Sequence, residues 1–157
     1  MRKRIITSEK SITDASEHNW LDLEQIAEVE ISSEDVAYPI EFALLANQTS
    51  GWRAAESGTQ IIRLLFIKPQ IVTRIWLNFV ETSIERTQEY KISCSMDNGQ
   101  SFQEIVRQQW NFSPSGSTSE IEDYSVDLPA VTTLEISINP DINSQNKFAS
   151  LAQLRLA

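Results

Sequence analysis

A tryptophan and an arginine stand side by side at Trp52 and Arg53, in a short segment between Gly51 and Gly58. An indole can stack on the apolar face of a sugar ring, and a guanidinium can donate hydrogen bonds to ring hydroxyls or to a carboxylate. In the structural alternative, Trp52 caps one end of a β-sheet core and Arg53 pairs with an acidic neighbour such as Glu56. Tryptophans at strand entrances usually pack, which favours the structural role for Trp52 and leaves both roles open for Arg53.

A second segment, RQQWNFSPSGSTSE over residues 107–120, combines aromatic and amide side chains with a loop rich in serine and glycine. That mixture suits a polyhydroxyl ligand, with an aromatic platform and amide donors and acceptors. Alternatively, Trp110 and Phe112 anchor the loop to the core while the serines are solvated. Loops on a rigid β scaffold often carry function, so we predict a ligand-binding rim at these two segments. Its candidate residues are Trp52, Arg53, Gln109, Trp110 and Asn111.

The residue types that most enzymes need are scarce in this chain. His18 is the only histidine and Cys94 the only cysteine, too few for a standard zinc site. No nucleophile elbow, phosphate-binding loop or dinucleotide fingerprint occurs, and there are only four glycines. The alternation around Cys94 directs its thiol inward, as a small core hydrophobe. We predict a protein without catalytic activity, metal ion or cofactor.

One acidic group could still supply oxygen ligands to calcium. Its members are Glu30, Glu34, Asp35 and Glu41. Acidic residues also favour helix N-termini, and a capped helix start is the interpretation that we prefer for this group.

The 157 residues carry a net charge of −9. Binding to nucleic acid phosphates or to anionic lipid needs a clustered positive patch, so this charge argues against both partners. The single cysteine rules out an internal disulfide. The basic start MRKR has no apolar segment behind it, and no apolar run is long enough to span a membrane. Together these features predict a cytoplasmic location and leave the oligomeric state open.

The first part of the chain carries the helical signals. Residues 1–18 are polar and are predicted to form a flexible or edge-covering arm, with residues 19–157 as a single domain. Apolar residues at helical spacing predict a helical turn over residues 19–27. They also predict a helix within residues 35–47, capped by Asp35 and starting near Pro39.

After residue 58 the pattern is that of β-strands. Apolar and polar residues alternate over residues 73–81, 89–96, 124–128 and 134–138. Asn98-Gly99 stands at a hairpin turn, with a return strand beginning near Phe102. Residues 61–67 are apolar except for Arg63, which predicts a central strand buried on both faces. About eight strands without helices between them predict an all-β fold: an antiparallel jelly-roll β-sandwich with one or two short helices near the N-terminus.

Several segments, taken in order, resemble the discoidin or coagulation factor 5/8 type C group of galactose-binding-like jelly rolls. They include VEISSED (29–35), SGWRAAESGTQIIRLLF (50–66), EYKISCSMDNGQSFQEI (89–105) and NKFASLAQLRL (146–156). The resemblance covers about residues 20–157. It implies a non-enzymatic module that binds glycans, phospholipid headgroups or proteins through loops at one end of the sandwich. The family's usual disulfide cannot form here, and Ala46-Asn47 replaces its Asp-Gly before the tryptophan.

A narrower resemblance is confined to GWRAAESGTQIIRL (51–64). This segment is similar to one in the N-terminal domain of the scaffold protein of single-strand-break repair, which has the same jelly-roll fold.

We therefore predict a non-catalytic module that binds carbohydrate through these loops. The alternative is an intracellular protein–protein interaction module of the same fold. Sugar binding predicts that the indole of Trp52 or Trp110 lies open in a groove beside Arg, Asn or Gln. A scaffold module predicts a broad apolar patch on the strand face that carries Trp76, which is otherwise core.

Overall fold

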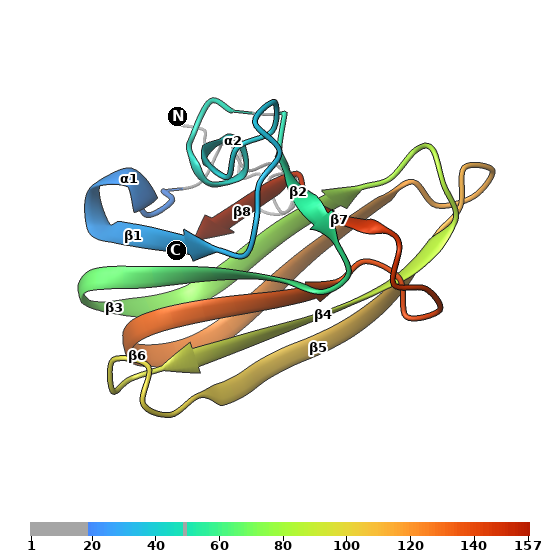
Figure 1. The fold of residues 1–157 in the computed structure, drawn as a ribbon. Coiled ribbons are helices and arrows are strands. Elements are labelled where there is room, and N and C mark those ends of the chain that lie inside the picture. The colour runs from blue at the N-terminus through green and yellow to red at the C-terminus, as the bar shows by residue number, and fades with distance from the viewer. Residues whose placement is uncertain (1–18, 49) are drawn as a thin grey trace, which may run out of the picture.

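Antiparallel strands make up most of the structure (Figure 1). The computed structural model describes residues 19–48 and 50–157. The elements are α1 (Leu23–Ile26), β1 (Ala27–Ile31), α2 (Glu41–Leu44), β2 (Trp52–Ser57), β3 (Gln60–Val80), β4 (Arg86–Ser95), β5 (Gln103–Phe112), β6 (Ser119–Asn139), β7 (Phe148–Leu151) and β8 (Gln153–Leu156). The predicted β-sandwich of about eight strands with short N-terminal helices is confirmed. The predicted arm over residues 1–18 lies outside the described residues.

Two long strands, β3 and β6, organise the sheets. Each has 21 residues, and they pair antiparallel along most of their length. The pairing is irregular between Leu65 and Arg74, and there both strands turn back on themselves (Figure 1). The two halves of this ribbon therefore form two facing layers. One layer is extended by β1, β4 and β5, the other by β8, while β2 and β7 form a separate antiparallel pair.

The core fills the space between these layers. Alternation along β3 buries Ile62 and Leu64 in its first half and Leu77 and Phe79 in its second half. Cys94 is also buried, which agrees with its predicted role as a core hydrophobe.

The prediction that residues 61–67 are buried on both faces is wrong for the outer face. Ile61, Arg63 and Leu65 are only partly buried there. The neighbouring strands place Glu30 and Glu135 beside Arg63, which forms ion pairs with both. The outer face is therefore partly solvated, with the Arg63 ion pairs between apolar neighbours.

The helical segments are shorter than predicted. Asp35 does not cap α2, because its Oδ1 accepts a hydrogen bond from the Ala37 amide at 2.9 Å and closes an earlier turn. Glu34 instead supplies the acceptor at the start of α2, since its Oε2 accepts a hydrogen bond from the Ile40 amide at 2.9 Å. Pro39 lies between this turn and α2, as its fixed geometry favours. Within the described residues, no helix is long and apolar enough to cross a membrane.

Trp76 lies on the outer face of its strand, opposite the inward-pointing Leu77. It is only 2% exposed, and the ring of Trp20 lies 6.5 Å from its own. Of the two interpretations of Trp76, the structure agrees with burial, because the chain around Trp20 covers this face.

Gly51 is the tightest backbone position at the start of β2. Its φ of +79° favours glycine, and an added Cβ would lie 2.9 Å from both the Ala152 Cα and the Leu151 oxygen. We expect Gly51→Ala to lower the free energy of unfolding by about 2 kcal/mol or more, because a left-handed backbone costs about 1–2 kcal/mol before any clash. Denaturant unfolding measures this loss.

Gly116→Ala is the matched control, because its added Cβ would meet nothing closer than 3.6 Å. Its effect should stay within about 0.5 kcal/mol. Equal destabilisation by the two substitutions would contradict the constraint at Gly51.

Candidate functional site

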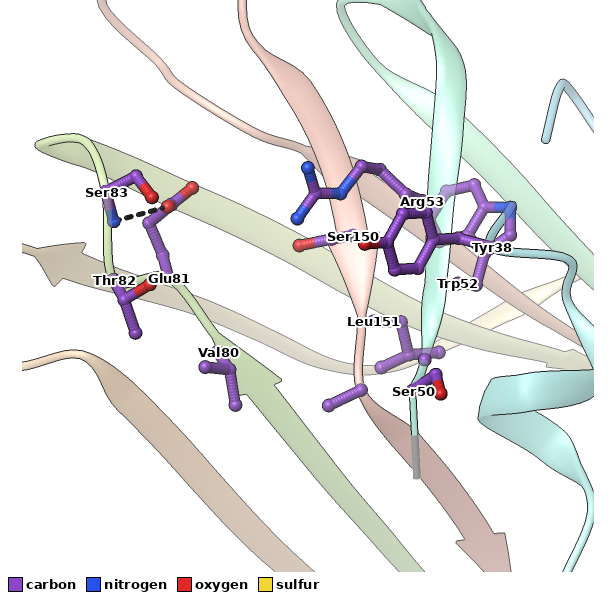
Figure 2. Close-up of a pocket in the computed structure, with 12 residues that line it drawn as sticks. Tyr38, Ser50, Trp52, Arg53, Val80, Glu81, Thr82, Ser83, Ser150 and Leu151 are labelled. Atoms are coloured by element: carbon purple, nitrogen blue, oxygen red, sulfur yellow. Dashed lines mark hydrogen bonds between the residues drawn. The ribbon is translucent and has the colours of Figure 1, made fainter. Parts of the chain in front are cut away.

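Two adjoining hollows open where β2 and β7 meet the loop that follows β3. Their volumes are about 160 Å³ and about 270 Å³. Figure 2 shows the residues that line the first of them. Both are lined by Arg53, Val80, Glu81, Ser83 and Ser150. Because the two hollows share these walls, we describe them together as the Arg53 site.

The pairing of β2 with β7 directs Arg53 into this site. Trp52 is paired with Leu151 and Arg53 with Ser150, so alternation sends the tryptophan inward and the arginine outward. The Arg53 backbone is held on both sides: its amide donates to the Tyr38 carbonyl at 3.2 Å, and its carbonyl accepts from the Asp35 amide at 2.8 Å. The side chain extends over Ser150 toward the loop of Glu81 and Ser83 (Figure 2).

Trp52 does not provide the stacking platform that sugar binding would require. Its side chain is 1% exposed, and its Nε1 donates a hydrogen bond to the Ser33 carbonyl at 3.1 Å. The indole forms part of the inner wall of the first hollow but has no open ring face. Trp52 therefore has the packing role that its place at a strand entrance favoured.

Arg53, by contrast, is exposed and is not paired with a carboxylate of any described residue. Its guanidinium carbon lies 4.9 Å from the centroid of the Tyr38 ring, and it forms no ion pair with any described residue. The pairing with Glu56 that the sequence allowed is absent. Stacking on Tyr38 orients the planar group and leaves its N–H donors available to a ligand.

Buried Arg86 fixes the opposite wall of the site. Its Nε donates to the Glu81 Oε1 at 2.8 Å, while the Glu81 Oε2 accepts from the Ser83 amide at 3.1 Å. Burial raises the pKa of the Glu81 carboxyl, but the hydrogen bonds from Arg86 and Ser83 outweigh it and leave the pKa below its usual value. Glu81 therefore remains an ionised acceptor at neutral pH.

Phe148 provides an aromatic face that the sequence analysis missed. It is 48% exposed and lines the second hollow with Ile84, Asn146 and Lys147. The alternation along β7 gives the reason: Ala149 and Leu151 are buried, while Phe148 and Ser150 point outward. Phe148 is the exposed aromatic residue of the Arg53 site.

The structure separates the second predicted segment from this site. Gln109, Trp110 and Asn111 lie on β5, and none of them lines either hollow. Trp110 is half-buried against the core, with its Nε1 donating to the Ser117 Oγ at 3.1 Å.

The two amides of this segment alternate with Trp110 and lie on the other face of β5. The Gln109 Nε2 donates to the Glu89 Oε2 at 2.9 Å, and the Asn111 Oδ1 accepts from the Thr87 hydroxyl at 2.8 Å. Trp110 therefore packs against the core and the two amides bond to β4, as in the alternative interpretation in which this segment is anchored by its aromatic residues.

The acidic group near the N-terminus is engaged by protein donors. Glu30 pairs with Arg63, while Glu34 and Asp35 accept backbone amides. Over residues 19–48 and 50–157, no three or more His, Cys, Asp or Glu residues cluster in a way that could hold a metal ion.

The model of the F5/8 type C domain matches residues 28–154, and the chain belongs to this family. The comparison with curated proteins found no match.

Several solved structures share the fold and are carbohydrate-binding modules. The family 32 module of C. perfringens NanJ, in complex with galactose, has a TM-score of 0.62 at 17% identity and covers 83% of this chain and 92% of its own. The family 32 module of AlyQ, in complex with 4,5-unsaturated mannuronic acid, has a TM-score of 0.58 at 25% identity, with coverages of 89% and 98%. A pectin binding module has a TM-score of 0.61 at 18% identity, with coverages of 84% and 90%.

Glu120 is a buried carboxyl between the layers, outside the Arg53 site. Burial and the neighbouring Glu122 raise its pKa from the ordinary 4.5 to about 8. Because the folded pKa lies above the unfolded one, the bound proton stabilises the fold fully below pH 4.5, and this contribution is lost as the pH rises through about 8. We expect the wild-type free energy of unfolding to fall by a few kcal/mol between about pH 5 and about pH 9.

Glu120→Gln should remove most of this dependence, because the amide cannot ionise. Denaturant unfolding at the two pH values measures it, and Glu28→Gln on the exposed face of β1 is the control that should behave as wild type. A wild-type stability that rises with pH over this interval would contradict a raised pKa at Glu120.

Proposed function

We propose that the protein is a non-catalytic module that binds carbohydrate in the Arg53 site. The observation that carries this proposal is the free guanidinium of Arg53 beside the open ring of Phe148, in a hollow of saccharide size. Membership of the F5/8 type C family supports it. Structural neighbours solved with galactose and with an unsaturated mannuronic acid support it too.

The residues of the site have the chemistry that a sugar ring requires. A sugar presents apolar C–H faces, which the exposed Phe148 ring can contact, and hydroxyls, which need both donors and acceptors. Arg53 supplies charged donors, and the hydroxyls of Ser83 and Ser150 supply groups that donate and accept. Glu81 adds an acceptor that Arg86 holds in place.

The same site lacks the groups for glycoside hydrolysis. That reaction ordinarily uses two carboxyl groups, one as acid and one as base or nucleophile. Glu81 is the only carboxylate among the described residues that line the two hollows, and it is already paired with Arg86. This arrangement supports recognition without catalysis.

The alternative of a protein-interaction module predicted a broad apolar patch, with the Trp76 face as its candidate. That surface is absent among the described residues, since Trp76 is covered by the segment that contains Trp20. The carbohydrate proposal is therefore the one that we carry forward.

Arg53→Ala tests the site directly. On an array of neutral and acidic glycans, followed by calorimetry with the best ligand, we expect saturable binding by the wild type. Affinity should fall by about 30-fold in Arg53→Ala, because hydrogen bonds from a charged donor contribute about 2 kcal/mol.

Arg107→Ala is the matched control for this loss, because Arg107 is also exposed but lies on β5 outside the hollows. Its affinity should remain within about twofold of the wild type. No binding to any glycan, or equal losses in the two variants, would overturn the proposal.

Phe148→Ala tests the aromatic contact. We expect about a fivefold loss of affinity, because an aromatic contact contributes about 1 kcal/mol. Trp110→Phe keeps a ring against the core and should bind as the wild type does. A large loss in Trp110→Phe with none in Phe148→Ala would place the ligand on β5 instead.

A further inference from the structure

The Arg53 site concentrates free positive charge in an acidic protein. The chain has a net charge of −9, yet Arg53 and Lys147 line the hollows without an ion pair to any described residue. The other described arginines are engaged elsewhere. Arg63, Arg74, Arg86 and Arg107 pair with carboxylates, and Arg155 donates to backbone carbonyls.

The only carboxylate lining the described part of the site does not cancel this charge. Glu81 bonds to Arg86, whose side chain is fully buried directly behind it. Arg86 therefore neutralises Glu81 from behind, and Arg53 and Lys147 leave two positive charges on the lining of the hollows. A hollow with a local excess of one sign favours a ligand of the opposite sign.

Arg53 is also oriented for an anion. Its guanidinium stacks on Tyr38 at 4.9 Å, which restrains the plane of the group without occupying its N–H donors. A planar guanidinium matches two oxygens of a carboxylate or a sulfate, and this match is geometrically more demanding than a bond to one hydroxyl. A restrained arginine loses less conformational freedom when the anion binds.

We infer that the Arg53 site binds a sugar unit that carries an anionic group, a carboxylate or a sulfate. Arg53 pairs with this group and Lys147 adds a second positive charge, while Phe148 contacts the ring. This inference rests on the proposed carbohydrate function and narrows its ligand class.

The experiment compares ligands that differ only in charge, with the full chain, by calorimetry. Trigalacturonate is titrated as the ionised carboxylate and as its methyl ester, and galactose sulfate is titrated beside galactose. We expect the anionic member of at least one pair to bind about tenfold tighter or more, because charge-assisted pairs contribute on that order. The pair that shows the preference identifies the anionic group.

Arg53→Gln and Lys147→Gln locate the preference. Each amide keeps hydrogen-bonding capacity and removes the charge, so the ratio of anionic to neutral affinity should fall toward one. Arg107→Gln is the control and should keep the wild-type ratio. A preference that survives both site substitutions would overturn the assignment to Arg53 and Lys147.

The remaining outcomes separate this inference from the proposed function. Equal affinity for the charged and neutral members of both pairs would overturn the anionic preference and leave carbohydrate binding standing. No binding of any of the four ligands, together with no binding on the glycan array, would overturn both.

Discussion

The buried guanidinium of Arg86 is the interaction on which the candidate site depends. It donates to the Glu81 Oε1 at 2.8 Å, to the Pro140 carbonyl at 3.0 Å and to the Ser150 hydroxyl at 3.5 Å. It also lies 4.9 Å from the centroid of the Phe112 ring. A buried cation requires such partners, so the three chain segments that supply them are held in fixed relation to one another.

These segments are the ones that carry the site. Glu81 begins the loop after β3, Pro140 precedes the loop that leads to β7, and Ser150 lies on β7 opposite Arg53. The hydrogen bonds of buried Arg86 thus set the distance between Glu81 on one side of the hollows and the β2–β7 pair that carries Arg53 on the other. A rigid hollow of this kind can bind a weakly apolar, highly hydrated ligand. Its side chains are already held in place, so little conformational entropy is lost when the ligand binds.

Local sequence patterns predicted most of the strands but neither the length of the helices nor the site. The hairpin was predictable because Asn98 and Gly99 adopt the positive φ angles, 59° and 85°, that these residue types favour. The length of α2 was overestimated because the Asp35 carboxylate can cap either a helix or a local turn. In the structure it accepts from the Ala37 amide and closes the turn.

The site itself depends on contacts between distant segments. Arg53 and Ser150 become neighbours only through the pairing of β2 with β7, which no local pattern encodes. The sequence identified Arg53 as a candidate because of its residue type, but it could not show that Arg86 would engage Glu81 and that Arg53 would stay free. For the same reason the sequence could not show that Phe148, and not Trp52, would be the exposed aromatic residue of the site. Burial is decided by the packing of the two layers, whereas aromatic character alone gives no sign of it.

The chain belongs to the F5/8 type C family, and its two hollows open where β2 and β7 meet the loop after β3. The fold by itself does not define a ligand, because function depends on the particular side chains that the fold presents. Here those side chains are a free arginine, an exposed phenylalanine and a carboxylate already neutralised by a buried partner. This combination favours recognition of a saccharide over its hydrolysis.

The most direct measurement is an NMR titration with trigalacturonate that follows side-chain N–H resonances. The Arg53 Nε–H signal reports on the proposed site, and the amide signals of Gln109 and Asn111 report on β5. Our account predicts that the Arg53 signal moves in a saturable way while the two amide signals stay in place. Movement of the Gln109 and Asn111 signals with no change at Arg53 would contradict it.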